Sequence, residues 1–208
     1  VGATNIMDYI TIDTAGNATD FGDITVARSH LGGTNSNTRG VFAGGNASSQ
    51  TDRIEYFAIA STGNTTDFGN LTQAISKSPG GASSGVRGCF AGGRPTGGAH
   101  SLNTIDYITI ATTGNASDFG DLTDTFRIHE GLSDGSRGCF GGGTRAADTN
   151  SDVIDYITIS TTGNALDFGN LTNATDVLGA LSNSVRGVWV GGNDNVNLIQ
   201  YITIATTG

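Results

Sequence analysis

An internal repeat of about 50 residues constrains this chain more than any other feature of its sequence. Tyrosines at positions 9, 56, 107, 156 and 201 mark successive copies, which are 47, 51, 49 and 45 residues apart. A repeat of this length forms one supersecondary unit that buries its apolar side chains against neighbouring units. The chain is therefore predicted to fold as a series of similar units rather than around one thick core.

Each unit follows one pattern of aromatic, arginine and glycine residues. It begins with I-D-Y-I-T-I-x-T-T-G-N-A-x-D-F-G-D-L-T, continues through a Gly/Ser-rich run, and ends with R-G-C/V-F-A-G-G and a loop of variable length. Large residues that recur this regularly are expected to pack at equivalent places in every unit. The repeated structural positions are Tyr9, Tyr56, Tyr107, Tyr156, Tyr201, Phe21, Phe68, Phe119, Phe168, Phe42, Phe90, Phe140, Trp189, Arg39, Arg87, Arg137 and Arg186.

Two groups of these positions carry specific expectations. The first four tyrosines, together with the aromatic residues at 42, 90, 140 and 189, are expected to be largely buried between units. Each repeat arginine is expected to bind a carboxylate or backbone carbonyls of its own or the next unit, because a guanidinium group holds several donors in a fixed geometry. The alternative for the arginines is a solvated turn residue.

The local pattern within a unit predicts short β-strands. Residues 105–110 are rich in β-branched and aromatic side chains, which favour strands. Further short strands are predicted at 118–123, 132–136 and 137–142, with a turn at Thr-Gly-Asn 113–115. No segment shows a helical pattern.

Four short strands in a unit of this length are typical of one blade of a β-propeller. The fold class expected is all-β, a propeller of about four antiparallel blades whose Gly/Ser-rich strands lie nearest the axis. A β-solenoid and a β-sandwich are the alternatives. The expected boundaries within this single repeat domain are a partial blade at 1–25, blades at 26–73, 74–124 and 125–173, and a partial blade at 174–208.

The two ends of the chain contribute one strand too many for four closed blades. The predicted strands number 17 rather than 16, because the last strand, 198–205, duplicates the first, 6–13. The terminal strands are expected to find partners, since an unpaired strand edge is a template for another chain. They could close the ring within one chain or join a neighbouring chain, and the sequence could also be a piece cut from a larger ring.

The repeat resembles two groups of known proteins. The order R-G-V-F-A-G-G, loop, I-D-Y-I-T-I is similar to a kelch-type blade, in which a double glycine ends the second strand. Gly44-Gly45 and Tyr56 match this pattern, whereas Phe68 stands where a kelch blade has tryptophan. The longer phrase Y-I-T-I-A-T-T-G-N-A-x-D-F-G-D-L-T resembles repeats in virion structural proteins of marine and cyanobacterial tailed phages, which implies a virion or extracellular location.

No catalytic constellation is predicted from the sequence. The repeated D-F-G lacks the lysine and H-R-D segments of a kinase, so its expected role is structural. His30, His100 and His129 are spread over different units, which favours surface or loop histidines over a metal site. Cys89 and Cys139 occupy a position that is valine elsewhere, so both are predicted to be free, buried thiols.

Calcium is the one cofactor that the pattern leaves open. Asp20, Asp67, Asp118 and Asp167 recur in register, and oxygen-rich turns can hold calcium. The strict calcium-loop pattern D-x-[DN]-x-[DN]-G is missing. The competing interpretation is that each aspartate accepts backbone N–H groups within its own turn, or pairs with a repeat arginine.

The charge of the chain restricts its partners. Nineteen acidic and ten basic residues give a net charge of −9, which disfavours binding to nucleic acid and to anionic membranes. No run of apolar residues is long enough for a transmembrane helix.

The sequence thus predicts a non-enzymatic virion structural or appendage protein, such as a tail fibre or surface module. Its variable loops, at 46–52, 94–103, 144–152 and 193–197, differ in length on a constant frame, as expected of a binding face. The expected partners are other copies of the chain, other virion proteins or a host-surface glycan. The alternatives are an extracellular adhesin or filament subunit of a cell and, third, a carbohydrate-active enzyme on a propeller scaffold.

Overall fold

The protein is built of antiparallel β-sheets that follow one another along the chain. The computed structural model describes residues 2–77, 79–193 and 197–206, and the secondary structure within them consists of strands. This confirms the all-β prediction. No helix long and apolar enough to span a membrane occurs among the described residues.

Four sheets and one hairpin make up the architecture. The N-terminal hairpin consists of β1 (Thr4–Tyr9) and β2 (Thr19–Arg28). Sheet I contains β3 (Gly32–Asn35), β4 (Arg39–Ala43), β5 (Thr51–Ala58), β6 (Thr66–Ser76) and β9 (Arg94–Pro95). Sheet II contains β7 (Gly80–Ser83), β8 (Arg87–Ala91), β10 (Leu102–Thr109) and β11 (Ser117–Phe126). Sheet III contains β12 (Glu130–Ser133), β13 (Arg137–Gly141), β14 (Val153–Thr158) and β15 (Leu166–Asn170), and sheet IV contains β16 (Leu178–Ser182), β17 (Arg186–Gly191) and β18 (Ile199–Thr203).

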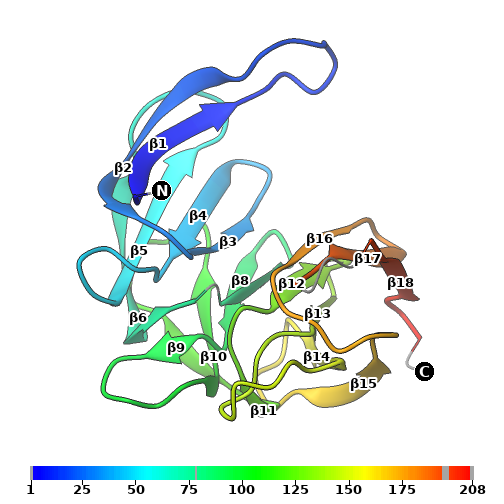
Figure 1. The fold of residues 1–208 in the computed structure, drawn as a ribbon. Coiled ribbons are helices and arrows are strands. Elements are labelled where there is room, and N and C mark those ends of the chain that lie inside the picture. Colours follow the sequence, from blue (N-terminus) through cyan, green and yellow to red (C-terminus); the bar gives the residue numbers. More distant parts are fainter. Residues whose placement is uncertain (1, 78, 194–196, 207–208) are drawn as a thin grey trace.

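The sheets are arranged side by side around an arc, with the hairpin at one end and sheet IV at the other (Figure 1). The short first strands face the inside of the arc, where β3 contacts β7, β7 contacts β12 and β12 contacts β16. Glycine is required there, because a Cβ atom on Gly81 would overlap the carbonyl of Gly33 and one on Gly131 would overlap that of Gly81. The prediction that the Gly/Ser-rich strand is innermost is therefore confirmed.

The arc is not closed by its ends. Within the described residues, β1 pairs with β2 and β18 pairs with β17, and the hairpin and sheet IV belong to separate sheets. Closure of the ring within one chain, one of the alternatives for the terminal strands, is therefore not seen among the described residues. Both terminal strands leave apolar side chains exposed, among them Ile6 in β1 and Ile199 in β18.

The strand count differs from the prediction by one short strand. β9 pairs with the end of β6 through Ile75 and Pro95, which raises the total from 17 predicted strands to 18 observed. This strand lies at the start of a variable loop, where the repeat pattern carries no information. The fourth strand of sheet II is also longer than expected, since β11 continues to Phe126 instead of ending at Thr123.

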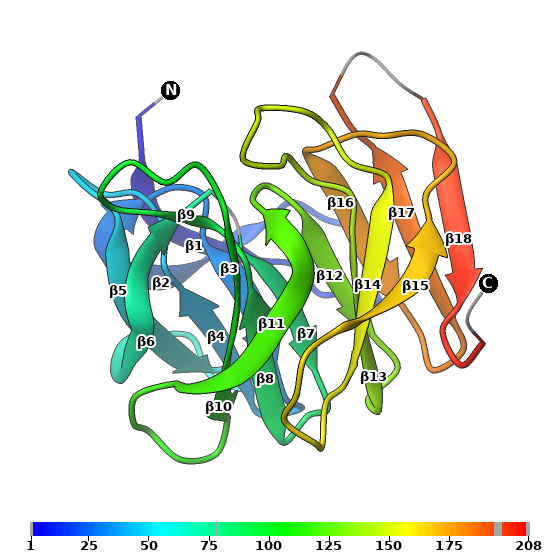
Figure 2. The same ribbon diagram turned by 90° about the horizontal axis from the view of Figure 1, so that it is seen from below.

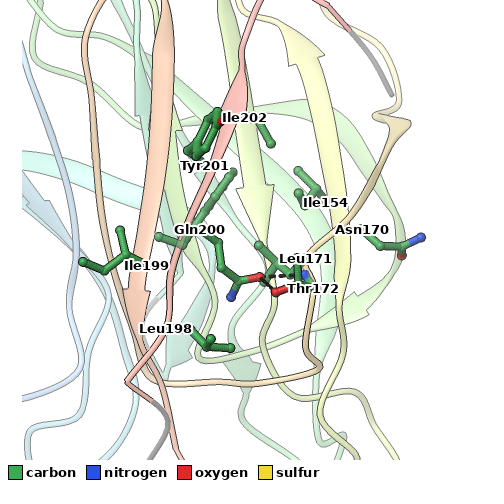
Figure 3. A pocket seen from close by; sticks show the side chains of 10 residues that line it. Ile154, Asn170, Leu171, Thr172, Leu198, Ile199, Gln200, Tyr201 and Ile202 are labelled. Carbon is green, nitrogen blue, oxygen red and sulfur yellow. Dashed lines mark hydrogen bonds between the residues drawn. The ribbon is translucent and has the colours of Figure 1, made fainter.

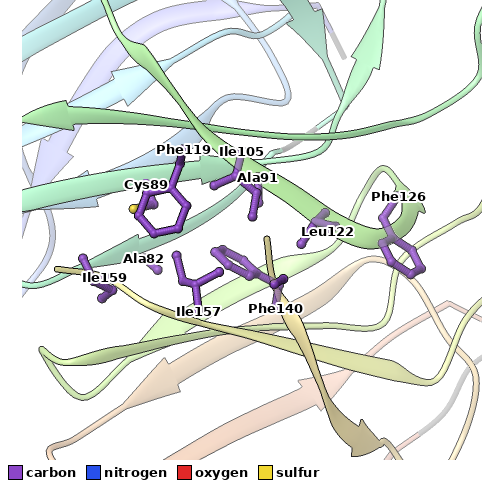
Figure 4. Packing of buried hydrophobic residues seen from close by; sticks show 11 residues of the cluster. Ala82, Cys89, Ala91, Ile105, Phe119, Leu122, Phe126, Phe140, Ile157 and Ile159 are labelled. Carbon is purple, nitrogen blue, oxygen red and sulfur yellow. The ribbon is translucent and has the colours of Figure 1, made fainter. Parts of the chain in front are cut away.

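The hydrophobic core lies between neighbouring sheets. Figure 4 shows the cluster between sheets II and III, in which Phe119 and Ile105 of one sheet face Phe140 and Ile157 of the next. Two further clusters occupy the equivalent junctions on either side. Because each sheet buries its apolar residues against the next one, burial stabilises the array as a whole rather than any single sheet.

Backbone contacts reinforce each junction at the D-F-G phrase. The glycine of the following T-G-N turn donates its N–H to the phenylalanine carbonyl, at 2.7 Å for Gly63 to Phe21, 2.7 Å for Gly114 to Phe68 and 2.8 Å for Gly163 to Phe119. The glycine that follows this phenylalanine also contacts the turn. Gly120, for example, lies against the backbone of Gly163, and its φ angle is +145°. Both the approach and the conformation require glycine.

Replacing Gly120 by alanine is expected to lower the free energy of unfolding by at least about 1–3 kcal/mol, the usual cost of a non-glycine residue in a sparsely populated backbone region. Its Cβ atom would lie 2.5 Å from the carbonyl carbon of Gly163. Urea denaturation followed by circular dichroism measures the change. Gly16→Ala is the control, since a Cβ atom there meets no atom within 4 Å, and equal effects of the two changes would contradict the close-approach argument.

Candidate functional site

Three of the four repeat arginines join neighbouring sheets. In each case the Nη1 atom donates to the carbonyl of an isoleucine at the end of the third strand in the next sheet. The distances are 2.9 Å for Arg39 to Ile110, 2.9 Å for Arg87 to Ile159 and 2.7 Å for Arg137 to Ile204. The predicted bonding to carbonyls of the next unit is therefore confirmed for these three. Arg186, in the last sheet, is exposed and has no such carbonyl among the described residues.

The same arginines lie over the repeat tyrosines. Each guanidinium carbon is 4.4–4.5 Å from the ring centroid of Tyr56, Tyr107, Tyr156 or Tyr201, a cation–π geometry. Within sheets I, II and III the edge of each tyrosine also meets the phenylalanine of the D-F-G phrase, at 5.9–6.0 Å between centroids. Arginine, tyrosine and phenylalanine thus form one stack in every complete sheet.

The tyrosines are less buried than predicted. Tyr9 and Tyr201 are exposed, and Tyr56, Tyr107 and Tyr156 are half-buried, so the prediction of largely buried rings is wrong for this position. The rings in sheets I, II and III are each covered by an arginine and a phenylalanine, whereas among the described residues Tyr9 contacts a phenylalanine only and Tyr201 an arginine only.

The aromatic residues of the second strands also differ in their burial. Phe42 is half-buried, because the hairpin beside sheet I lacks inner strands to cover it. The expected burial is confirmed at Phe90, Phe140 and Trp189. The D-F-G phenylalanines at 21, 68, 119 and 168 are buried as well.

The sequence did not predict that the polar residue before the tyrosine is buried in each of the four sheets. Asp106 accepts hydrogen bonds from the backbone N–H of Thr72, at 2.9 Å, and from its hydroxyl, at 2.7 Å. Asp155 binds Thr123 with the same two distances. Each threonine belongs to the preceding sheet, so these bonds also cross the junctions. Burial raises the pKa of both carboxyl groups, and the threonine hydrogen bonds oppose that shift.

The equivalent residues in sheets I and IV keep this contact with different chemistry. Gln200 accepts both bonds from Thr172 at 2.6 Å. Glu55 accepts from Thr25 and also forms a buried ion pair with Arg28 at 2.7 Å. The signal was present in the sequence, because an acidic or amide residue precedes the tyrosine in every copy.

The repeated aspartates of the D-F-G phrase cap their own turns. A carboxylate oxygen accepts the N–H two residues later, at 3.1 Å for Asp20, 3.2 Å for Asp118 and 3.0 Å for Asp167. The turn interpretation is confirmed for these three. Among the described residues, no group of three or more His, Cys, Asp or Glu side chains could hold a metal ion.

The cysteines and one histidine lie in the interior. Cys89 and Cys139 are free and buried, as predicted, and burial raises the pKa of both thiols to about 12. The expectation of surface or loop histidines holds for His30 and His100 but is wrong for His129. His129 is fully buried between Phe126 and Phe140, and neither ring nitrogen has a hydrogen-bond partner among the described residues. Burial lowers its pKa to about 4.

The variable loops project from one end of the array and the constant turns from the other (Figure 2). The loops follow the second strand of each sheet, and the glycine pair that begins each one has positive φ angles, such as +71° and +95° at Gly142 and Gly143. Most of the last variable loop, residues 194–196, lies outside the described residues.

Arg127 fixes the two longest described loops to each other. Its Nη1 atom donates to the carbonyl of His100 at 3.1 Å and to the hydroxyl of Ser101 at 3.2 Å in one loop. It also donates to the carbonyl of Arg145 at 3.3 Å in the other, while Nη2 binds Asp148. The hydrogen bond from Arg127 lowers the pKa of the exposed Asp148 carboxyl. The loop tips are thus presented in a defined relative position.

Several hollows occur among the described residues, and two of them lie against the first strands and against β18. One, of about 190 Å³, is lined by β3, β7, β12 and β16 at the inside of the arc. There Ser133 donates its hydroxyl to the carbonyl of Ser83 at 2.8 Å, and Ser182 donates to that of Ser133 at 2.7 Å. The other, of about 220 Å³, runs along β18 next to Leu171 (Figure 3). Neither hollow contains the combination of nucleophile and base that catalysis of hydrolysis needs.

Comparison with known proteins adds no relative to this description. No protein-family profile matches the chain, and no curated protein is significantly similar to it. The kelch-like and virion-like resemblances therefore stay predictions from the sequence.

Replacing Asp106 by alanine is expected to lower the free energy of unfolding by about 2–3 kcal/mol, because the N–H and hydroxyl of Thr72 lose their buried acceptor. Asp8→Ala is the matched control. Asp8 occupies the equivalent position in the hairpin but is exposed, so its replacement should change the value by less than about 0.5 kcal/mol. Equal losses in urea denaturation would show that the junction bond is not the cause.

His129→Leu is expected to remove part of the acid sensitivity of the protein. The pKa of His129 is about 4 in the folded protein, compared with an ordinary value of 6.5. Between pH 4 and pH 6.5 the unfolded chain therefore binds a proton at this histidine that the folded chain does not bind. The free energy of unfolding therefore falls as the pH drops from about 6.5 to about 4, by up to roughly 3 kcal/mol.

Leucine fits this position, since the equivalent residues are Leu31, directly before β3, and Leu178, the first residue of β16. Thermal denaturation at pH 7 and pH 5 compares the variant with the wild type. His100→Asn, at an exposed loop position, is the control. An unchanged pH dependence in His129→Leu would contradict the assignment.

Proposed function

We propose that the chain is part of a β-propeller that acts as a non-enzymatic recognition module. Three features support the propeller. Four-stranded antiparallel sheets repeat around an arc, their short glycine-rich strands line a shared hollow, and their long strands lie outside. A solenoid does not stack complete four-stranded sheets around an inner axis.

The single observation that carries the proposed function is the division between the two ends of the array. The junction contacts recur at equivalent positions from sheet to sheet, whereas the loops at one end differ in length and sequence, and Arg127 joins two of them. Variable loops on a rigid, repeated frame are the usual form of a binding surface. The described residues present charged, amide and hydroxyl groups there, including His100, Arg145 and Asp148, which suits polar ligands such as glycans or a protein surface.

The location in a phage particle is the second part of the proposal. It rests on the resemblance of the repeated phrase to virion structural proteins, and the acidic, repeat-built frame is compatible with an appendage or tail fibre. Gold-labelled antibodies raised against the chain are expected to decorate such an appendage on purified phage particles. Labelling of cell-surface filaments instead would favour the adhesin alternative.

A loop exchange tests the binding face. Replacing residues 145–150 by the shorter loop 47–50 of sheet I is expected to weaken binding to an array of bacterial surface polysaccharides at least tenfold. The control exchanges the constant turn 84–86 for the equivalent turn 134–136 at the opposite end. Circular dichroism verifies folding of both variants, and equal binding by both would contradict the assignment of the loop end.

A further inference from the structure

The two end faces of the array carry complementary parts of the junction that repeats within it, namely the second and third strands of sheet IV and the strands of the hairpin. At each internal junction, one sheet contributes an arginine and apolar residues of its second and third strands. The next sheet contributes two isoleucines from its third strand and the carbonyl that accepts from the arginine. The outer face of sheet IV carries the first set, and the outer face of the hairpin carries the second.

Burial shows that both halves lack their partner in the described structure. The isoleucine that accepts the arginine is buried at 110, 159 and 204, with 1%, 0% and 0% exposure, whereas the equivalent Ile12 of the hairpin is 91% exposed. On sheet IV, Ile199 is 76% exposed, although the equivalent Ile54, Ile105 and Ile154 are buried. The exposed apolar residues therefore lie where the internal array buries them.

Arg186 already has the geometry that its internal counterparts use. Its guanidinium carbon lies 4.5 Å from the ring centroid of Tyr201, compared with 4.5, 4.4 and 4.4 Å at the three internal junctions. In those junctions the arginine also donates to a carbonyl of the next sheet. The donor of the missing bond is therefore prearranged.

The charges of the two faces are complementary. Arg186 is the one charged residue of β16, β17 and β18. The hairpin strands carry Asp8, Asp20 and Asp23 against a single cation, Arg28. The strands at the two ends therefore carry net charges of opposite sign, which favours attraction between unlike ends and repulsion between two hairpins.

We propose that copies of this chain associate head to tail through these faces, with Arg186 of one copy donating to the Ile12 carbonyl of the next. Val188 and Ile199 of the first copy pack against Ile10 and Ile12 of the second, continuing the internal junction. The interface is heterologous, so each copy keeps one unoccupied face and assembly proceeds to a ring or an open filament. This association does not depend on what the variable loops bind.

Sedimentation velocity of the 208-residue chain, from about 1 μM to about 1 mM, the range of weak affinities, tests the proposal. The wild type is expected to assemble with increasing concentration. Arg186→Glu and Ile12→Asp are each expected to weaken assembly at least tenfold. Both positions are exposed, so circular dichroism and thermal unfolding should match the wild type.

Mixing the two variants distinguishes head-to-tail association from other arrangements. Each variant retains one intact face of opposite type, so an equimolar mixture is expected to form dimers that do not grow further. Assembly of Ile12→Asp alone to the wild-type extent would indicate contact between two sheet IV faces and overturn the proposal. A wild type that stays monomeric throughout, or a mixture without dimers, would overturn it as well.

Ile59→Asp is the matched control. Ile59 is the equivalent of Ile12 in sheet I and is exposed, but it lies beside the hairpin rather than on an end face. Its replacement is expected to leave assembly unchanged within about twofold. Loss of assembly in this variant would indicate that the inner strands of a second copy pack beside the hairpin. That result would contradict the face-to-face arrangement proposed here.

Discussion

The structure depends on the junction between neighbouring sheets, because the apolar residues of this protein are buried there. A sheet of short, glycine-rich strands has too few large side chains to form a core of its own. The cluster containing Phe119 is completed by Phe140 and Ile157 of the next sheet, and burial of such apolar area is the main favourable contribution to folding. Each sheet is consequently stable only as a neighbour of another, which makes stability a property of the array.

Polar contacts then give the junction its specificity. Apolar surfaces alone would allow neighbouring sheets to slide or rotate, whereas a buried carboxylate such as Asp155 is satisfied only when Thr123 is in register. The copies tolerate changes that preserve this requirement. Glu55 is longer than aspartate and is accompanied by the buried cation Arg28, while Gln200 replaces the carboxylate by an amide oxygen.

The repeat made much of this arrangement predictable from sequence. The all-β class, the innermost glycine-rich strand and the arginine bonds followed from residue types that recur at fixed places. The exposure of Tyr9 and the burial of His129 did not follow, because each depends on what the neighbouring sheet supplies at that point. The strand β9 was not predicted for a related reason. It lies in a variable loop, where the sequence of one repeat does not resemble that of the others. The choice between a closed ring and an open arc could not be made from sequence, because strand counting says nothing about the angle between sheets.

The position of the core between sheets also has a consequence for the gene. If a whole repeat were removed or duplicated, the two surfaces brought together would carry the same kinds of residues at equivalent positions. Glycines such as Gly120, which permit the close backbone approach at each junction, are present in every copy and would be preserved by such an event. The number of sheets is therefore free to change in steps of one without the appearance of a mismatched interface, while each added copy brings one more loop to the variable end.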